Sequence, residues 1–580
     1  MLSTKRNRSI RQLAWGASLF LASNAAYGQQ LPVVPDLPVQ QSTVAAPAGS
    51  ASIVDLKARV DRLEQQNQEL IRALQDVKAT PSQTGTAVPV ALPTPPAPET
   101  AESSQTPSPS EKTLTTPALC EPKKSSSVDA KATYKNGLFL WIESPNKEYT
   151  MHLGGWMQYD GVFWNQSPDL RTPQGARSGP AQGVASGAPQ GGIGNMQDGV
   201  YFRRIRIFAE GQIGQYGEYR LIPALENNQF STIGLDEFWA GLRDVPILGS
   251  FRVGHVKNPI GLEADMTSSS RTMTFMERSA YSEAIELSQN FVSGIWWGNH
   301  VLDDRVAWQA TLFRSSIAAS GAFFGDGQWG TQARLTGIPI YEDKGNELLH
   351  LGVSGGWRNG SNNLANSPYR LFQSRARVEM RDDDPASTPA GAQSIPNASS
   401  ARLIDTGAIA AKGLYLLGTE TLMIHGPLSF QAEYGWQFLN GAYGVAPTGL
   451  TLNPAITPNQ NYVFNGGYIQ VAYTLTGETR GYDKRLGALS RAYYGPDGPF
   501  HSYGAWEVAA RYSYVNLNDG FGANRIQGGT INGVSVALNW YLNNNFNMMF
   551  DWTYNERSNV PSNTIPGRVN GFGIEAQFQF

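Results

Sequence analysis

The chain has little cysteine and little charge. Its 580 residues include a single cysteine, Cys120, and charged residues make up only 16% of the composition. One cysteine excludes an internal disulfide framework and a metal site built from several cysteines. The net charge of −3 gives no reason to expect a nucleic-acid partner. Glycine, with 61 residues, is frequent, and aromatic residues reach 11%. This composition favours a β-structured protein in a solvent other than plain water over a cytosolic enzyme.

Long hydrophobic runs are also missing. The one apolar stretch near the N-terminus, LAWGASLFLASNAAYG, follows the basic segment KRNRSIRQ and ends in small residues. It is too short to span a bilayer comfortably, so it predicts a signal peptide over residues 1–28 rather than an anchor. No later stretch of 18 apolar residues occurs, so no transmembrane helix is expected in the exported chain.

The segment after the signal peptide contains a heptad repeat between two low-complexity regions. Residues 29–50 are rich in proline and alanine and are expected to be disordered, and residues 80–133 form a linker rich in Pro, Ser and Thr. Residues 51–79 predict a coiled coil, and therefore an oligomer, with a lone amphipathic helix as the alternative. We expect this coil to lie in the periplasm, where it and the linker could contact the cell wall. The a and d positions are Ile53, Leu56, Val60, Leu63, Asn67, Leu70, Leu74 and Val77.

From residue 134 onward the pattern changes to alternation with a period of two. In the stretch 506–514, large apolar residues alternate with Glu507, Ala509, Arg511 and Ser513. A soluble sandwich also alternates, but here many segments reach ten or more residues and carry aromatic residues at their ends. Long strands with interfacial aromatic residues are typical of a transmembrane barrel with a wet interior.

The alternating segments predict an all-β fold over residues 134–580, an antiparallel transmembrane barrel of sixteen strands. A sheet in lipid must close on itself, because every backbone group needs a partner there. The final strand, GFGIEAQFQF, is therefore expected to pair with the first strand, near YTMHLGGWMQYDGVF. The predicted strands are 149–163, 200–213, 217–226, 233–243, 250–257, 291–301, 305–314, 329–340, 347–358, 412–425, 428–439, 463–476, 504–516, 530–542, 546–557 and 568–580.

The selectivity of a barrel depends on the side chains that face its lumen. In VYFRRIRIFAEGQI, the alternation points Arg204 and Arg206 into the lumen, while Arg203 falls on the lipid-facing parity and is expected at the rim. In QSRARVEMR, the arginines Arg375, Arg377 and Arg381 share one face of an extended segment. Arg334, Arg358 and Arg402 are further lumenal candidates by parity or proximity. The alternative is that the arginines of the long connection are solvated loop charges.

The connection 258–290 follows Lys257 and contains Arg271 and Arg278. It is long and of mixed polarity, so we expect it to fold inward and constrict the pore. Guanidinium groups bind phosphate through paired, charge-assisted hydrogen bonds. Several such groups along one path would attract an anion and pass it onward, provided that each site binds it weakly.

Several of these motifs together resemble the phosphate-selective porins O and P. They are YKNGLFL, MHLGGWMQYDGVF, YFRRIRIFAEG, FRVGHVKNPIGLE, TSSSRTMTFMERS and SRARVE. The resemblance implies a homotrimer of barrels in the bacterial outer membrane, taking up phosphate or polyphosphate. It also implies an arginine-rich inner surface at Arg203, Arg204, Arg206, Arg375 and Arg377, and a constriction near Lys257, Arg271 and Arg278 with Asp236 as an acidic companion. Lys257 is the only lysine near this constriction, which departs from the family.

Other functions are weighed against this one. An outer-membrane enzyme would need a histidine with a carboxylate or serine near the rim, and none of the six histidines lies in a recognisable catalytic motif. His350 has lumenal parity without an obvious partner in the sequence. No enzyme activity, cofactor or metal is therefore expected. A general, nonspecific porin and a barrel that anchors an envelope tether remain as alternatives.

Overall fold

The structure is a computed structural model, and its described residues all belong to the second of two units, Ala118–Phe580. The predicted signal peptide, the disordered segment, the coiled coil and nearly all of the linker lie outside the described residues. The described ranges are 130–135, 139–172, 191–196, 198–225, 234–266, 272–286, 291–314, 329–359, 370–381, 402–407, 409–444, 460–490, 504–522, 525–543 and 545–580.

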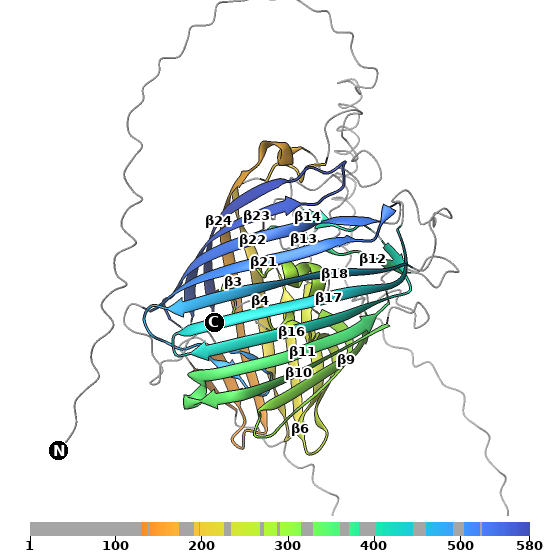
Figure 1. Cartoon of the computed structure of the whole chain (residues 1–580). Helices are drawn as coiled ribbons and strands as arrows, with labels where there is room; N and C mark the ends of the chain where they lie inside the picture. Colours follow the sequence, from red (N-terminus) through yellow and green to blue (C-terminus); the bar gives the residue numbers. More distant parts are fainter. Residues whose placement is uncertain are drawn as a thin grey trace, which may run out of the picture. The chain divides into compact units, whose positions relative to one another are not determined.

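Within these ranges, sixteen antiparallel strands form the wall of a barrel (Figure 1). Each corresponds to one predicted strand, with ends that differ by a few residues. The strands are β3 (Tyr149–Gln166), β4 (Gly199–Ile213), β5 (Gly217–Ala224), β6 (Gly234–Val245), β7 (Gly249–Lys257), β8 (Phe291–Val301), β9 (Val306–Arg314), β10 (Trp329–Glu342), β11 (Glu347–Arg358), β16 (Gly413–His425), β17 (Leu428–Gly444), β18 (Gln460–Thr474), β21 (Ala505–Asp519), β22 (Ile526–Tyr541), β23 (Phe546–Ser558) and β24 (Gly567–Gln579).

The barrel closes where the last strand meets the first. β24 pairs with β3 from Val569 opposite Gln166 to Gln579 opposite Trp156. Beyond the strand, the amide of Phe580 donates to the Gly155 carbonyl at 2.9 Å, and the Gly155 amide donates back at 2.8 Å. The predicted closure is therefore confirmed, and no strand of the wall is left with an unpaired edge at this seam.

The two faces of the wall differ as the alternation predicts. On β21, Val508 and Tyr512 point outward and are 38% and 44% exposed, whereas Glu507 and Ser513 point inward and are fully buried. The same pattern recurs on β24, where Phe572 and Ile574 are exposed and Glu575 is buried. An outer surface of large apolar side chains around a polar interior suits lipid outside and polar groups inside.

The connections are short at one end of the barrel and long at the other. The turns 214–216, 302–305 and 426–427 lie at the short end, as expected for short periplasmic turns. One connection at this end, 475–504, is long, as the gap between the predicted strands 463–476 and 504–516 implies. It carries the strand pair β19 (Tyr482–Asp483) and β20 (Ala488–Leu489), which forms its own small sheet.

A hairpin precedes the barrel. Its strands β1 (Lys131–Lys135) and β2 (Phe139–Glu143) pair with each other, and β2 pairs with the start of β3, from Leu140 opposite Leu153 to Glu143 opposite Thr150. β24 pairs with β3 only from Trp156 onward. The hairpin thus occupies the edge of β3 that lies past the end of β24.

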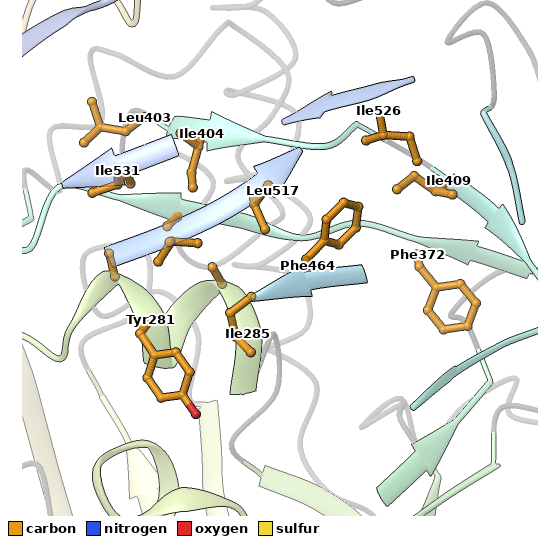
Figure 2. Close-up of a cluster of buried hydrophobic side chains, with 14 of the residues drawn as sticks. Tyr281, Ile285, Phe372, Leu403, Ile404, Ile409, Phe464, Leu517, Ile526 and Ile531 are labelled. Carbon is orange, nitrogen blue, oxygen red and sulfur yellow. The ribbon is translucent and has the colours of Figure 1, made fainter. Parts of the chain in front are cut away.

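The interior is not simply an open channel, because long connections pack an apolar core inside the barrel (Figure 2). Tyr281 and Ile285 of the connection 258–290 belong to the same buried cluster as Phe464 of β18, Leu517 of β21 and Ile404. Ile404 lies on β14 in the connection between β11 and β16. Removing these apolar groups from water stabilises the inward position of both connections. The connection between β11 and β16 holds β12 (Arg370–Phe372), β13 (Arg375–Arg377), β14 (Arg402–Asp405) and β15 (Ile409–Ala411).

Within the described residues, helical structure is limited to single turns. None of the helices among the described residues has the length and apolarity needed to cross a membrane. The turns are η1 (Pro168–Arg171), η3 (Gly261–Met266), η4 (Ser282–Glu286) and η5 (Asp343–Gly345).

Candidate functional site

The segment 258–286, as far as it is described, lies against the inner face of the barrel. The backbone amide of Glu263 donates to Glu433 of β17 at 2.8 Å, and the amide of Met276 donates to Asp551 of β23 at 2.8 Å. Inward carboxylates thus satisfy backbone donors that a buried loop would otherwise leave unpaired. The sequence pattern predicted that this connection folds inward, and the structure places it there.

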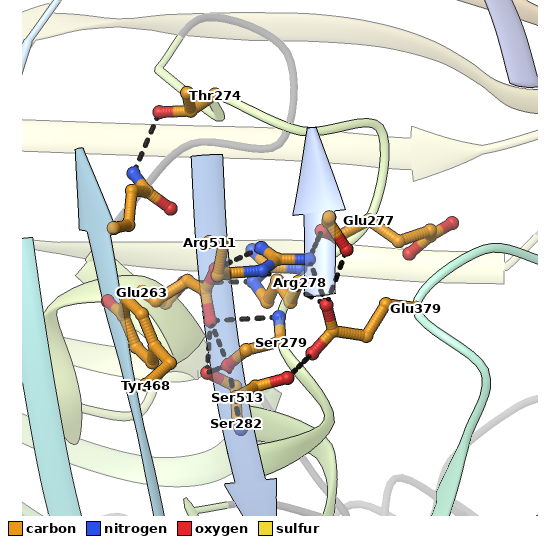
Figure 3. A network of polar contacts seen from close by, with 12 residues as sticks. Glu263, Thr274, Glu277, Arg278, Ser279, Ser282, Glu379, Tyr468, Arg511 and Ser513 are labelled. Atoms are coloured by element: carbon orange, nitrogen blue, oxygen red, sulfur yellow. Dashed lines mark hydrogen bonds and ion pairs between the residues drawn. The ribbon is translucent and has the colours of Figure 1, made fainter. Parts of the chain in front are cut away.

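Arg511 is the centre of the contacts that hold this segment (Figure 3). Its guanidinium group forms ion pairs with Glu263 at 3.1 Å and with Glu379 at 2.9 Å, and it donates to the carbonyl of Glu277 at 3.1 Å. The same group lies 4.3 Å from the ring centroid of Phe275. Arg511 therefore joins the barrel wall to both inward connections, because Glu263 and Glu379 belong to different ones.

Arg511 was not among the predicted site residues. The signal was present, since Arg511 shares the inward parity of β21 with Glu507 and Ser513. A lumenal arginine flanked by lumenal polar residues is as strong a pattern as the one that singled out Arg204.

A first cluster of arginines surrounds the carboxylate of Glu277. Arg203 forms a two-pronged contact with it, in which Nη2 donates at 3.2 Å. Arg381 approaches at 3.5 Å and Arg204 at 3.9 Å. Burial alone would raise the pKa of Glu277, but the nearby guanidinium charges, Arg203 foremost, outweigh it and hold this pKa well below its usual range. Three positive groups therefore converge on one ionised carboxylate; we call this set the Glu277 cluster.

A second cluster surrounds Glu283 and draws on the connection between β11 and β16. Arg377 approaches Glu283 at 3.3 Å, and the backbone amide of Arg377 donates to it at 2.9 Å. Arg402 contacts the same carboxylate. Burial would raise the pKa of Glu283, but the charges of Arg377 and Arg402 lower it.

The position of Arg203 differs from the prediction. Simple alternation placed it at the lipid-facing rim, but it is 7% exposed and contacts Glu277 inside the barrel. The cause is a β-bulge, since Gln158 of β3 pairs with Arg204 and the next residue, Tyr159, pairs with Phe202. The extra residue on β4 breaks the alternation and turns Arg203 inward beside Arg204.

The predicted run of arginines along 375–381 does not extend as one ladder. Only Arg375–Arg377 form a strand, β13, which pairs with β14. Arg375 is exposed, whereas Arg377 and Arg381 turn to different carboxylates, Glu283 and Glu277. The arginines are thus distributed over two clusters, each organised by a glutamate of the segment 258–286.

The other predicted residues lie at separate places along the lumen. Arg206 forms an ion pair with Asp236 at 2.5 Å, so the acidic companion lies beside an arginine. Arg278 donates to the carbonyl of Glu263 at 2.9 Å. Lys257 ends β7 with its amino group 6.0 Å from the centroid of the Phe291 ring. Arg358 ends β11, and Arg271 lies outside the described residues.

Arg334 belongs to a buried network with the histidine that lacked a partner in the sequence. Arg334 and His350 both contact Glu420, at 2.5 Å and 2.8 Å. The other ring nitrogen of His350 lies 2.6 Å from the hydroxyl of Tyr482. These four side chains come from three strands of the wall and the connection 475–504, so the histidine is held in a structural network.

The connection 475–490 also folds into the barrel, a feature that the sequence pattern did not predict. Arg480 forms an ion pair with Glu507 at 3.0 Å, and Arg334 donates to the carbonyl of Gly487 at 2.6 Å. Leu489 packs in one buried cluster with Leu262 of the inward segment 258–286. The lumen is therefore narrowed from both ends of the barrel.

A further lumenal arginine, Arg252, lies on β7. Arg252 lies between the rings of Trp239 and Trp296, at 4.3 Å and 4.4 Å from their centroids, and contacts Glu218 at 2.8 Å. Parity along β7 places Arg252 inward, so sequence analysis had a signal for it. Among the described ranges, no group of three or more His, Cys, Asp or Glu side chains is arranged to hold a metal ion.

Comparison with known proteins agrees with this architecture. The family model described as phosphate-selective porin O and P matches residues 182–580. An uncharacterized protein of Caulobacter vibrioides is 28% identical over 397 residues, covering 65% of this chain and 68% of its own length. Porin O of Pseudomonas aeruginosa is 25% identical over 457 residues, covering 76% and 91%.

Two solved structures are among those that resemble the barrel. The outer membrane channel DcaP of Acinetobacter baumannii aligns with 10% identity and a TM-score of 0.43, covering 76% of this chain and 99% of its own. The anion-selective porin from Comamonas acidovorans aligns with 8% identity and a TM-score of 0.40, covering 74% and 100%. The family match extends over most of the sequence, including fifteen of the sixteen strands of the wall. The chain therefore belongs to the phosphate-selective porin O and P family and is a porin of the outer membrane.

Proposed function

We propose that this porin passes small anions, with phosphate and polyphosphate as the preferred ones, by passive diffusion. The observation that carries the proposal is the convergence of arginines on the inward segment 258–286. Arg203, Arg204 and Arg381 meet at Glu277, and two more arginines meet at Glu283. Guanidinium groups in a site shielded from bulk water favour anions and bind oxyanions through paired hydrogen bonds.

The proposal assigns a route as well as a preference. An anion entering from the end of the long connections would first meet Arg375, which is exposed, and then the two arginine clusters beside the narrowed part of the lumen. Lys257 lies at the end of β7 that leads into the segment 258–286, and Arg206 lies farther along β4 than Arg203 and Arg204. Weak binding at successive positive groups would let an ion enter and leave. The homotrimer implied by the family resemblance belongs to the same proposal.

A general porin with weak selectivity is the second candidate, and one observation favours it. Most of the lumenal arginines contact carboxylates, as in the pairs of Arg206 with Asp236 and Arg334 with Glu420. Such pairs reduce the positive potential that a passing ion experiences.

Planar-bilayer recording with the full chain distinguishes the two candidates. In a KCl gradient, the reversal potential should show preference for chloride over potassium. Phosphate added at constant ionic strength should reduce the chloride current in a saturable way, because it competes for the arginine clusters. Cation preference would refute anion conduction. Anion preference with a chloride current that phosphate does not change at any concentration would leave only the general porin.

A further inference from the structure

We propose that the carboxylate of Glu277 is a tethered competing anion, which occupies an oxyanion site formed by Arg203, Arg204 and Arg381 and thereby sets how tightly the pore binds permeating anions. This role of Glu277 rests on the proposed anion conduction. It makes Glu277, an acidic residue, a determinant of specificity in an anion pathway.

The geometry around Glu277 is that of an oxyanion site. The Arg203 guanidinium contacts both carboxylate oxygens, with Nη2 at 3.2 Å from Oε2. Arg381 and Arg204 add ion pairs to the same Oε2 at 3.5 Å and 3.9 Å. A two-pronged contact from one guanidinium with further cations beside it is also the arrangement in which arginines bind phosphate.

The site is built by the fold rather than by flexible surface side chains. Arg203 and Arg204 are 7% and 3% exposed, and Glu277 is 6% exposed. Arg204 also donates to Gln158 at 2.6 Å, which fixes its direction. The backbone of Arg381 is held as well, because its carbonyl accepts a hydrogen bond from Tyr201 at 2.8 Å. The three guanidinium groups would therefore stay close together if the carboxylate charge were removed.

The segment that carries Glu277 is held independently of its side chain. The carbonyl of Glu277 accepts a hydrogen bond from Arg511 at 3.1 Å, and the neighbouring amide of Met276 donates to Asp551 at 2.8 Å. Replacing the carboxylate by an amide of the same shape should therefore leave the segment in place. Glutamine also keeps an oxygen that can accept a hydrogen bond from Arg203.

Other carboxyl groups do not take over this role. Asp160 and Glu575 lie directly opposite each other in the pairing of β3 with β24. Two adjacent buried carboxyl groups disfavour being charged together. Glu283 is the nearest analogue, but its side chain is 26% exposed, against 8% for Glu277, and its two arginines belong to the other cluster. Glu277 is therefore the carboxylate whose charge matters most here.

The test compares Glu277→Gln with the wild type in planar bilayers, using inorganic phosphate as the probe. The concentration of phosphate that halves the chloride current should fall by about tenfold, since a charge-assisted hydrogen-bonding partner that competes with phosphate is removed. The reversal potential in a KCl gradient should shift toward greater anion preference. Glu277→Asp, which keeps the charge, should stay close to the wild type in both measurements.

The control is Glu556→Gln, which removes a half-buried glutamate paired with Arg568 at 3.7 Å and should change neither value. An unchanged half-inhibiting concentration in a conducting Glu277→Gln channel would overturn the proposal. So would equal changes in Glu277→Gln and Glu277→Asp, because these would indicate displacement of the segment rather than loss of charge. If the wild type prefers cations, the proposed function fails, yet the shift between wild type and Glu277→Gln still decides the role of Glu277.

Discussion

Replacing Arg511 with methionine is expected to release the segment 258–286 from the barrel wall. The substitution leaves the carboxylates of Glu263 and Glu379 buried without their shared cation, and breaking a buried ion pair in this way costs about 3–5 kcal/mol. The segment also loses the contact between Arg511 and the Glu277 carbonyl. We therefore expect a lower melting temperature in detergent, a larger single-channel conductance and weaker selectivity between ions.

Two further variants give this prediction its controls. Arg511→Lys keeps the positive charge but cannot contact two carboxylates and a carbonyl with a planar fork, so it should fall between wild type and Arg511→Met. Arg568→Met removes an arginine that is paired at the surface with Glu556 and should leave conductance unchanged. An Arg511→Met channel with the conductance and selectivity of the wild type would show that the segment is held by other contacts.

Deleting residues 578–580 is expected to prevent stable closure of the barrel. The deletion removes the pairing of Phe578 with Met157 and of Gln579 with Trp156, together with the two backbone hydrogen bonds between Phe580 and Gly155. In lipid the freed backbone groups of β3 have no water to pair with, and each unsatisfied group costs several kcal/mol. The yield of folded barrel in lipid vesicles, measured by resistance to unfolding in unheated gels, should fall by about tenfold or more. A tenfold fall corresponds to a loss of only about 1.4 kcal/mol in the free energy of folding.

Phe580→Ala distinguishes the contribution of the backbone of residue 580 to barrel closure from that of its aromatic ring. Because the bonds to Gly155 are made by the backbone of residue 580, this variant should refold in vesicles nearly as well as the wild type. A deletion that refolds as well as Phe580→Ala would show that the barrel closes without these last pairs.

The wall of the barrel could be predicted from the sequence, because a period of two is imposed by the strand itself. Lipid outside and polar groups inside then make the alternation visible in each segment, as in Val508 and Glu507. Arg203 shows the limit of this reasoning, since one bulged residue reverses the parity of the part of β4 that precedes it. Val200 and Phe202 point outward there, whereas the outward residue after the bulge, Ile207, is odd-numbered.

The contents of the lumen were less predictable, for a different reason. The partners of Arg204, Arg377 and Arg334 are glutamates far away in the sequence, brought close by connections whose path depends on tertiary packing. Alternation shows that these side chains point inward but not what they meet there. The inward fold of 475–490 was missed for the same reason, because its anchors, such as the contact of Arg480 with Glu507, join two segments with separate patterns.

The central claim is that the polar face of each strand lines a conducting aqueous path and the apolar face contacts lipid. It is tested most directly on β4, where Glu210 points inward and Ile207 points outward. In a Cys120→Ser background, a charged, water-soluble thiol reagent should change the single-channel current of Glu210→Cys and leave that of Ile207→Cys unaltered. A membrane-soluble maleimide should label Ile207→Cys in vesicles. A current that responds at position 207 and not at position 210 would contradict the account.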